Sequence, residues 1–196
     1  KSFIFPILVY LLFFTGTPTA HAHPADVYAH TINITISQSS LQIEWEIKPG
    51  PMLTSYLWYQ ADADQDGTLT AFEAETWGRA RAALFTATFD DKPLPLLIES
   101  VQMPTDLQSF QAGEEFITFT LSAKLPQEST SIQRLVLNNG MEQKTSINWF
   151  YLSAIENTAF LFPIQKNNTI TIDIVQDRTL VADQSTLLFS WDSGTP

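Results

Sequence analysis

Two stretches near the start of the chain alternate between apolar and polar side chains. Isoleucines occupy every second position of Thr31–Ser37, and Leu, Ile or Trp occupies every second position of Leu41–Lys48. Because successive side chains of a strand point to opposite faces, this period of two predicts two half-buried strands. The residues between them, 38–40, form a short polar connection, so we expect the two strands to pair as a hairpin.

The pattern changes after Lys48. Met52–Ala61 carries apolar residues at helical spacing, and Pro51 before it suits a first helical turn. Ala71–Phe85 is rich in Ala and Glu, which favours a second helix. The side chains expected on the buried faces of this helix pair are Leu53, Leu57, Trp58, Phe72, Trp77, Leu84 and Phe85.

The rest of the chain returns to short β-like stretches separated by polar turns. The further predicted strands are Ala87–Phe89, Leu94–Val101, Phe116–Leu121, Ile132–Leu137, Ile147–Leu152, Thr169–Val175 and Leu187–Trp191. Residues 106–115 and 122–130 are predicted loops, and Asn138-Asn139-Gly140 is predicted to be a hairpin turn. The predicted fold class is mainly β, an antiparallel β-sandwich with a helix-loop-helix inserted at about residues 52–85.

The segment between the two predicted helices has the pattern of a calcium-binding loop. Residues 62–73 read DADQDGTLTAFE, which matches the EF-hand pattern over its full length. In such a loop alternate positions point at one centre, a glycine permits the sharp turn, and the last acid supplies two oxygens. The expected ligands are Asp62, Asp64, Asp66, the Thr68 carbonyl, Thr70 directly or through water, and both oxygens of Glu73.

Calcium is the expected cofactor rather than magnesium, because a bidentate carboxylate and about seven oxygens suit the larger ion. The four carboxylates repel one another without an ion, so binding and ordering of the loop should be coupled. Paired EF-hands join through the eighth position, here Leu69, but the sequence contains no second loop. Leu69 should therefore pack on the sandwich or across a dimer axis, and the calcium affinity should be weak, with a Kd of about 10⁻⁴–10⁻³ M.

Composition narrows the classes of partner and activity. The chain has 10 Lys+Arg against 21 Asp+Glu, a net charge of −11, which disfavours nucleic acid and anionic lipid and favours cations. It has no cysteine, so disulfides, thiolate metal sites and thiol nucleophiles are excluded. The sequence has no nucleophile elbow, P-loop or HExxH motif, so we expect a protein that is not an enzyme.

The first 22 residues are predicted to be a signal peptide. Lys1, the apolar run Phe3–Phe14 and the small-x-small triplet Ala20-His21-Ala22 follow in the expected order. The apolar run is shorter than the ~20 residues of a membrane-spanning helix, which disfavours the alternative of a membrane anchor. Residues 23–196 should form the exported domain, periplasmic or secreted, with no stable membrane span after cleavage.

Two histidines suggest a second, weaker metal site. Cleavage after Ala22 would leave His23 at the mature N-terminus, where its amine and imidazole can chelate copper or nickel, and His30 could add a ligand. The more ordinary interpretation is a tail without metal. The aromatic residues Tyr56, Trp58, Tyr59 and 149–151 could stack on sugar in a cell-surface binding module, although core packing is the more common use.

The chain resembles a known family over about His23 to Val101. A mature His-Pro start, paired strands, PGPMLTSYLWYQADADQDGTLTAFEAETW and FDDKPLPLLIESV follow in an order similar to the extracytoplasmic N-terminal domain of bacterial nickel/cobalt transporter-like membrane proteins. The resemblance implies an accessory or sensing domain beside a membrane transporter. The residues themselves predict calcium binding by one EF-hand in an exported β-sandwich, as a structural or sensory module. The alternatives are a copper- or nickel-binding accessory domain of a metal transport system that uses the mature N-terminal His, and a calcium-stabilised module that binds a cell-surface glycan or protein.

Overall fold

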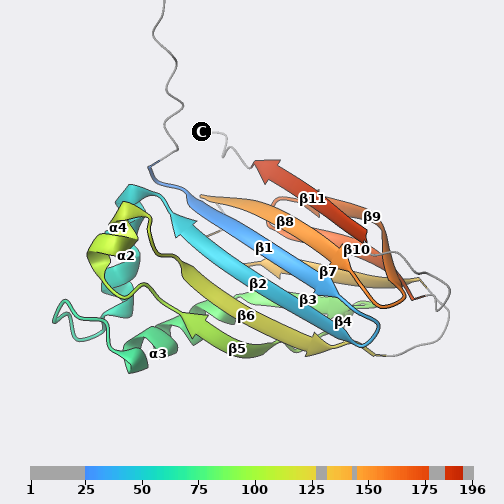
Figure 1. Ribbon diagram of the computed structural model, residues 1–196, viewed down its shortest axis with the longest axis horizontal. Coiled ribbons are helices and arrows are strands. Elements are labelled where there is room, and N and C mark those ends of the chain that lie inside the picture. Colours follow the sequence, from blue (N-terminus) through green and yellow to red (C-terminus); the bar gives the residue numbers. More distant parts are fainter. Residues whose placement is uncertain (1–24, 127–131, 143–144, 177–183, 192–196) are drawn as a thin grey trace, which may run out of the picture.

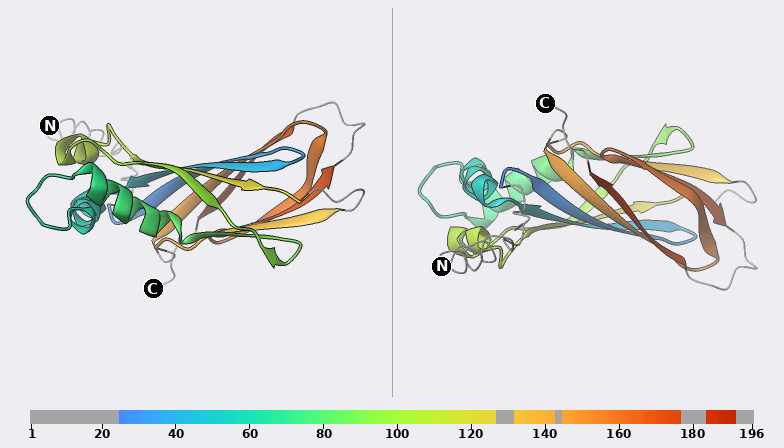
Figure 2. Two further views of the ribbon diagram at one scale, coloured as in Figure 1. Left: turned by 90° about the horizontal axis from the view of Figure 1, so that it is seen from below. Right: turned by 90° about the horizontal axis from the view of Figure 1, so that it is seen from above.

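Two β-sheets packed on one another form the body of the protein. The structure is a computed structural model that describes residues 25–126, 132–142, 145–176 and 184–191. One sheet has six strands in the order β11-β8-β1-β2-β6-β5, and the other has five in the order β4-β3-β7-β10-β9 (Figure 1). Figure 2 shows the two layers from the side, with the helices gathered at one end. The mainly β, sandwich-like fold class predicted from the sequence is confirmed.

The bounds of the elements are as follows. The six-stranded sheet contains β1 (Tyr28–Ile36), β2 (Ser40–Pro49), β5 (Leu97–Gln102), β6 (Ile117–Lys124), β8 (Ser146–Ala154) and β11 (Gln184–Trp191). The five-stranded sheet contains β3 (Phe85–Phe89), β4 (Lys92–Pro93), β7 (Gln133–Asn139), β9 (Thr158–Lys166) and β10 (Thr169–Gln176). The helices are α2 (Pro51–Ala61), α3 (Ala71–Ala82) and α4 (Leu107–Ala112). Within the described ranges, the structure has no helix that combines the length and the apolar character needed to cross a membrane.

The predicted hairpin is present as β1 and β2, which pair antiparallel from Tyr28↔Pro49 to Ile36↔Leu41. Its alternating apolar side chains face the core, where Ile32 and Trp45 are fully buried and join Leu137 of the opposite sheet in one cluster. Burying a side chain of this size stabilises the fold by about 1.5–3 kcal/mol. One pairing departs from the antiparallel prediction, because β1 and β8 run parallel.

The two helices expected around residues 52–85 are present, and the second is shorter than predicted. The second predicted helix ends at Ala82, and Phe85 begins β3. Leu57, Trp58, Trp77 and Phe85 are buried as predicted, whereas Phe72 is 79% and Leu84 40% exposed. The prediction for Phe72 and Leu84 is wrong because α3 turns Trp77, Gly78 and Ala82 inward and packs on β5.

The Asn-Gly hairpin prediction is wrong. β7 and β8 lie in different sheets and therefore do not form a hairpin. Asn139 is buried and donates from Nδ2 to Asn148 Oδ1 at 2.8 Å, while its own Oδ1 accepts from the N–H of Met141 at 3.0 Å. The hydrogen bond between Asn139 and Asn148 of the other sheet thus takes the place of the hairpin turn that Asn-Gly predicts.

The other corrections also concern connecting segments. The predicted loop 106–115 contains α4, because Asp106 caps it by accepting from the N–H of Ser109 at 2.8 Å and Phe110 is buried. The predicted loop 122–130 begins inside β6, which continues to Lys124. Strand β9 was not predicted. It contains Pro163, and it lies at the edge of its sheet, where a proline is tolerated.

Candidate metal centre

The loop between α2 and α3 projects beyond the end of both sheets (Figure 1). It begins at Asp62, whose N–H donates to the Trp58 carbonyl at 2.9 Å as the C-cap of α2. It ends at Thr70, the N-cap of α3. Gln65 and Gly67 have φ of 59° and 86°, in the left-handed region that tight turns use. The chain is therefore wound tightly between two helices that each pack on the core.

Three carboxylates meet inside this loop. Asp62, Asp64 and Asp66 each offer a ligand atom, and these atoms lie within 4.8 Å of one another. Asp62 is fully buried, whereas Asp64 and Asp66 are exposed. Their spacing of two residues along the loop brings the three carboxylates together.

Backbone hydrogen bonds fix the three carboxylates. The N–H of Gly67 donates to Asp62 Oδ2 at 2.9 Å, the N–H of Asp66 donates to Asp64 Oδ1 at 3.2 Å, and the N–H of Thr68 donates to Asp66 Oδ1 at 2.7 Å. Asp62 Oδ1 is buried and has no hydrogen-bond partner among the described residues. A buried anionic oxygen without a donor or a cation is costly, so this atom requires an explanation.

Glu73 is not one of the three carboxylates whose ligand atoms lie within 4.8 Å of one another. Its Oε1 accepts from the N–H groups of Ala63 at 2.9 Å and Asp64 at 3.3 Å, and its Oε2 accepts from the hydroxyl of Thr70 at 2.6 Å and the N–H of Thr70 at 3.0 Å. These bonds, led by that of the Thr70 hydroxyl, hold the pKa of Glu73 below its ordinary value. Glu73 thus already ties the start of the loop to the start of α3.

Thr70 and Glu73 form a capping box, which the motif-based prediction does not include. The hydroxyl of Thr70 accepts from the N–H of Glu73 at 3.3 Å, and Glu73 returns a bond to the Thr70 backbone. The signal was present as Thr-x-x-Glu before a helix. Both residues therefore have a structural role in addition to the ligand role expected from the motif.

Leu69 packs on the sandwich. It is half-buried against the main hydrophobic cluster, which is one of the two alternatives that the absence of a second loop predicted.

His30 has no ring nitrogen available for a metal. It is fully buried, its Nδ1 accepts from Trp45 Nε1 at 3.0 Å, and its Nε2 lies 3.1 Å from Ser146 Oγ. Burial lowers the pKa of His30 to about 3. His23, the other member of the predicted second metal site, lies outside the described residues. The expectation that His30 adds a ligand there is not supported.

The aromatic residues considered for sugar binding divide between core and surface. Trp58 and Phe150 are buried, whereas Tyr56, Tyr59 and Tyr151 are exposed. The exposed members lie on two different elements, with two tyrosines on α2 and Tyr151 on β8.

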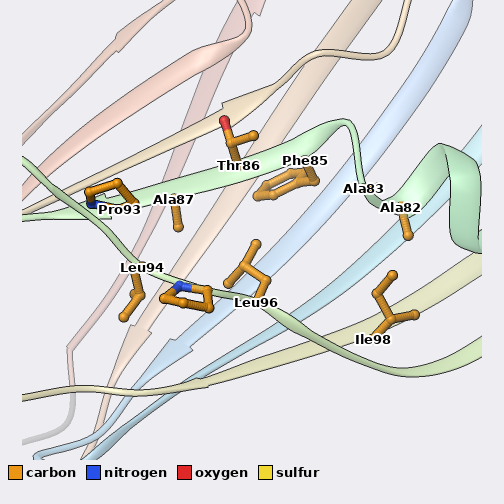
Figure 3. A pocket seen from close by; sticks show the side chains of 10 residues that line it. Ala82, Ala83, Phe85, Thr86, Ala87, Pro93, Leu94, Leu96 and Ile98 are labelled. Atoms are coloured by element: carbon orange, nitrogen blue, oxygen red, sulfur yellow. The ribbon is translucent and has the colours of Figure 1, made fainter.

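An apolar pocket of about 370 Å³ lies elsewhere, between the start of β3 and the segment that leads into β5 (Figure 3). The residues that line it are Ala82, Ala83, Phe85, Thr86, Ala87, Pro93, Leu94, Pro95, Leu96 and Ile98. None of them is ionisable, so the side chains that line the pocket offer no general acid or base.

The comparisons with known proteins leave the family open. No family model matches the chain, and no curated protein matches it. Among solved structures, it is similar to yeast LTA4 hydrolase in complex with bestatin, at 9% identity and a TM-score of 0.20 over 80% of this chain and 29% of that one. Native leukotriene A4 hydrolase from Saccharomyces cerevisiae gives 9% identity and a TM-score of 0.20 over 90% of this chain and 33% of that one. The chain spans about a third of the length of these enzymes, and a likeness this low carries no argument about fold or function.

Proposed function

We propose that this chain binds one calcium ion in the loop 62–73. The observation that carries the proposal is Asp62 Oδ1, a buried carboxylate oxygen with no hydrogen-bond partner among the described residues. It belongs to a carboxylate that is grouped with those of Asp64 and Asp66. A cation at the centre of the three carboxylates would supply the missing partner and remove their mutual repulsion.

The donor set favours calcium among the cations. All the groups that converge are hard oxygens, which exclude the soft metals that thiolates and thioethers select. The loop is largely exposed, and a flexible shell of six to eight oxygens suits calcium better than the strict octahedron of magnesium. The Thr68 carbonyl and Thr70, directly or through water, would add ligands. Glu73 would complete the coordination shell if its carboxylate gave up its hydrogen bonds to the N–H groups of Ala63 and Asp64 and bound the ion instead.

A bound ion would link the two helices. Asp62 is the C-cap of α2, and Glu73 lies in the first turn of α3, so both elements would share one centre. At a calcium concentration of ten times Kd the ion would add about 1.4 kcal/mol to the free energy of unfolding. This effect suits a structural or sensory accessory module outside the cytoplasm, beside a membrane transporter or a cell-surface protein.

Calorimetric titration of the full chain with calcium tests the proposal. We expect one site with a Kd of about 10⁻⁴–10⁻³ M and weaker binding of magnesium. Glu73→Gln should weaken calcium binding by about tenfold or more, because the variant removes one charge and the bidentate ligand. Glu44→Gln makes the same change on the exposed face of β2 and should leave binding unaltered. Absence of calcium binding to the wild-type chain by calorimetry and by equilibrium dialysis would overturn the proposal.

A further inference from the structure

The chain contains two dipeptides of the kind that rearranges without an enzyme. They are Asp66-Gly67, in the loop between α2 and α3, and Asn139-Gly140, at the end of β7. An aspartate or asparagine side chain can cyclise onto the next main-chain nitrogen, and a following glycine has no side chain to obstruct the approach. The structure places these two dipeptides in very different surroundings.

Asn139-Gly140 is held by hydrogen bonds on both residues. The Asn139 side chain is buried, its Nδ2 donates to Asn148, and its Oδ1 accepts from the N–H of Met141. The N–H of Gly140 donates to the carbonyl of Leu84 at 3.1 Å, and a Cβ at Gly140 would lie only 2.7 Å from that oxygen. The side chain and the attacking nitrogen are both fixed, so this dipeptide should react only after β7 opens.

Asp66-Gly67 is accessible. Both residues are exposed, and outside the chain neighbours of Gly67 no described atom lies within 4 Å of the position that its Cβ would occupy. Asp66 Oδ1 accepts from the N–H of Thr68 at 2.7 Å. This bond closes an Asx-turn, whose ring contains both the carboxylate carbon of Asp66 and the nitrogen of Gly67. The N–H of Gly67 donates to Asp62 Oδ2 at 2.9 Å, so an acceptor already contacts the proton that must leave.

We propose that the folded chain forms isoaspartate at Asp66-Gly67 and not at Asn139-Gly140. The Gly67 nitrogen attacks Cγ of the protonated Asp66 carboxyl group, a C–N bond forms, and the carboxyl hydroxyl leaves with the N–H proton as water. The product is a cyclic imide. Water then adds to one of its two carbonyl carbons. Cleavage of the C–N bond at the former main-chain carbonyl leaves Gly67 joined to the side chain of Asp66.

The rearrangement changes the loop in two ways. It lengthens the main chain by one carbon atom between Asp66 and Gly67, and it moves the free carboxylate from Cβ to Cα. The turn that brings Asp66 to Asp62 and Asp64 would be lost. One consequence rests on the calcium site proposed above: the isoaspartate form should bind calcium at least about tenfold more weakly, because one ligand is displaced.

Ageing of the full chain in chelator at neutral pH tests the proposal. Peptide mass spectrometry with electron-transfer fragmentation locates isoaspartate, and enzymatic methylation measures its total amount. We expect Asp66 to react in the folded chain at a rate within about tenfold of its rate in the urea-unfolded chain, because the loop is exposed. Asn139 should deamidate readily in urea but at least about a hundredfold more slowly in the folded chain.

The Asp66→Glu variant is the matched control. Glutamate keeps the charge in the exposed loop but would have to close a larger and less favourable ring. The total isoaspartate of the folded variant should therefore fall close to background, while its reaction at Asn139 in urea should stay like that of the wild type.

Three results would overturn the proposal. The first is an Asp66 that stays unreacted in the folded chain over a time in which it largely converts in urea. The second is more isoaspartate at residue 139 than at residue 66 in the folded chain. The third is a folded Asp66→Glu variant that keeps the wild-type total. The ageing experiment contains no calcium, so isoaspartate at residue 66 in a chain that binds no calcium would overturn the proposed function alone.

Discussion

Trp45 donates its indole N–H to Nδ1 of His30 at 3.0 Å, inside the hairpin of β1 and β2. An indole nitrogen can only donate, so Nδ1 is unprotonated and the ring proton is on Nε2. Nε2 then donates to Ser146 Oγ at 3.1 Å. The hydroxyl of Ser146 in turn donates a hydrogen bond to the carbonyl of Met141 or of Glu142. The site therefore holds a neutral imidazole, and a second ring proton would break the bond to Trp45.

His30 should make the stability of the fold depend on pH. Burial lowers its pKa to about 3 from an ordinary value of 6.5, so the unfolded chain binds the proton more readily than the folded chain. The stabilisation is complete above about pH 6.5 and is lost as the pH falls toward 3. Between about pH 7.5 and about pH 5 we expect the free energy of unfolding to fall by about 2 kcal/mol from this group. Urea denaturation across that range measures the change.

The His30→Gln variant separates this group from the other titrating residues. Glutamine keeps a donor and an acceptor but does not titrate, so the variant should be less stable at pH 7 and should lose most of the pH dependence that the wild type has above about pH 5. An unchanged pH dependence in His30→Gln would contradict the assignment.

His30 was predicted to be a metal ligand, but the alternating pattern of β1 already indicates that its side chain is buried. The alternation that predicts the first strand has Ile32, Ile34 and Ile36 facing inward, and His30 is in phase with them. Extending that period by one step would have placed the ring in the core. Its partner Ser146 could not have been foreseen, because the parallel pairing of β1 with β8 joins segments more than a hundred residues apart.

Asp62→Asn should have opposite effects with and without calcium. The amide keeps an acceptor for the N–H of Gly67, replaces an unpartnered carboxylate oxygen by a donor, and removes one of the three grouped negative charges. In chelator we expect the variant to be more stable than the wild type by about 1 kcal/mol. In calcium at about ten times Kd the wild type should gain about 1.4 kcal/mol and the variant almost nothing. Thermal unfolding in each condition measures both differences, and an equal calcium gain in the two proteins would count against the role of Asp62.

The loop shows what a short motif can and cannot predict. The pattern D-x-D-x-D-G predicts the convergence of Asp62, Asp64 and Asp66, because these contacts are local and the turn at Gly67 sets them. The same kind of local reasoning fails at Asn138-Asn139-Gly140. There, the side chain of Asn139 is hydrogen-bonded to Asn148 on β8, in the other sheet. Spacing along the sequence does not reveal this partner.

Asn148 should be important for joining the sheets. From β8 it accepts a hydrogen bond from Asn139 Nδ2 at 2.8 Å and donates to Asn168 Oδ1 at 2.7 Å, in a buried chain of amides. Asn148→Ala would leave both neighbours without these partners, so we expect a loss of about 2–4 kcal/mol in the free energy of unfolding. Asn33→Ala is the control on the exposed side of β1 and should change stability by less than about 0.5 kcal/mol. Equal effects of the two substitutions in urea denaturation would argue against the amide chain.

Gly78 should be required for the packing of α3 on β5. A Cβ added at Gly78 would lie 2.1 Å from Cγ1 and 3.2 Å from Cβ of Val101, much closer than van der Waals contact. Alanine normally stabilises a helix relative to glycine by about 0.5–1 kcal/mol, but here the clash should dominate and cost about 1–3 kcal/mol. The double variant Gly78→Ala/Val101→Ala removes the clashing methyl groups. Its loss in the free energy of unfolding should therefore be smaller than the sum of the losses in the two single variants. Additive losses in chemical denaturation would mean that the helix and strand move apart freely, and that close packing at Gly78 does not hold α3 in place.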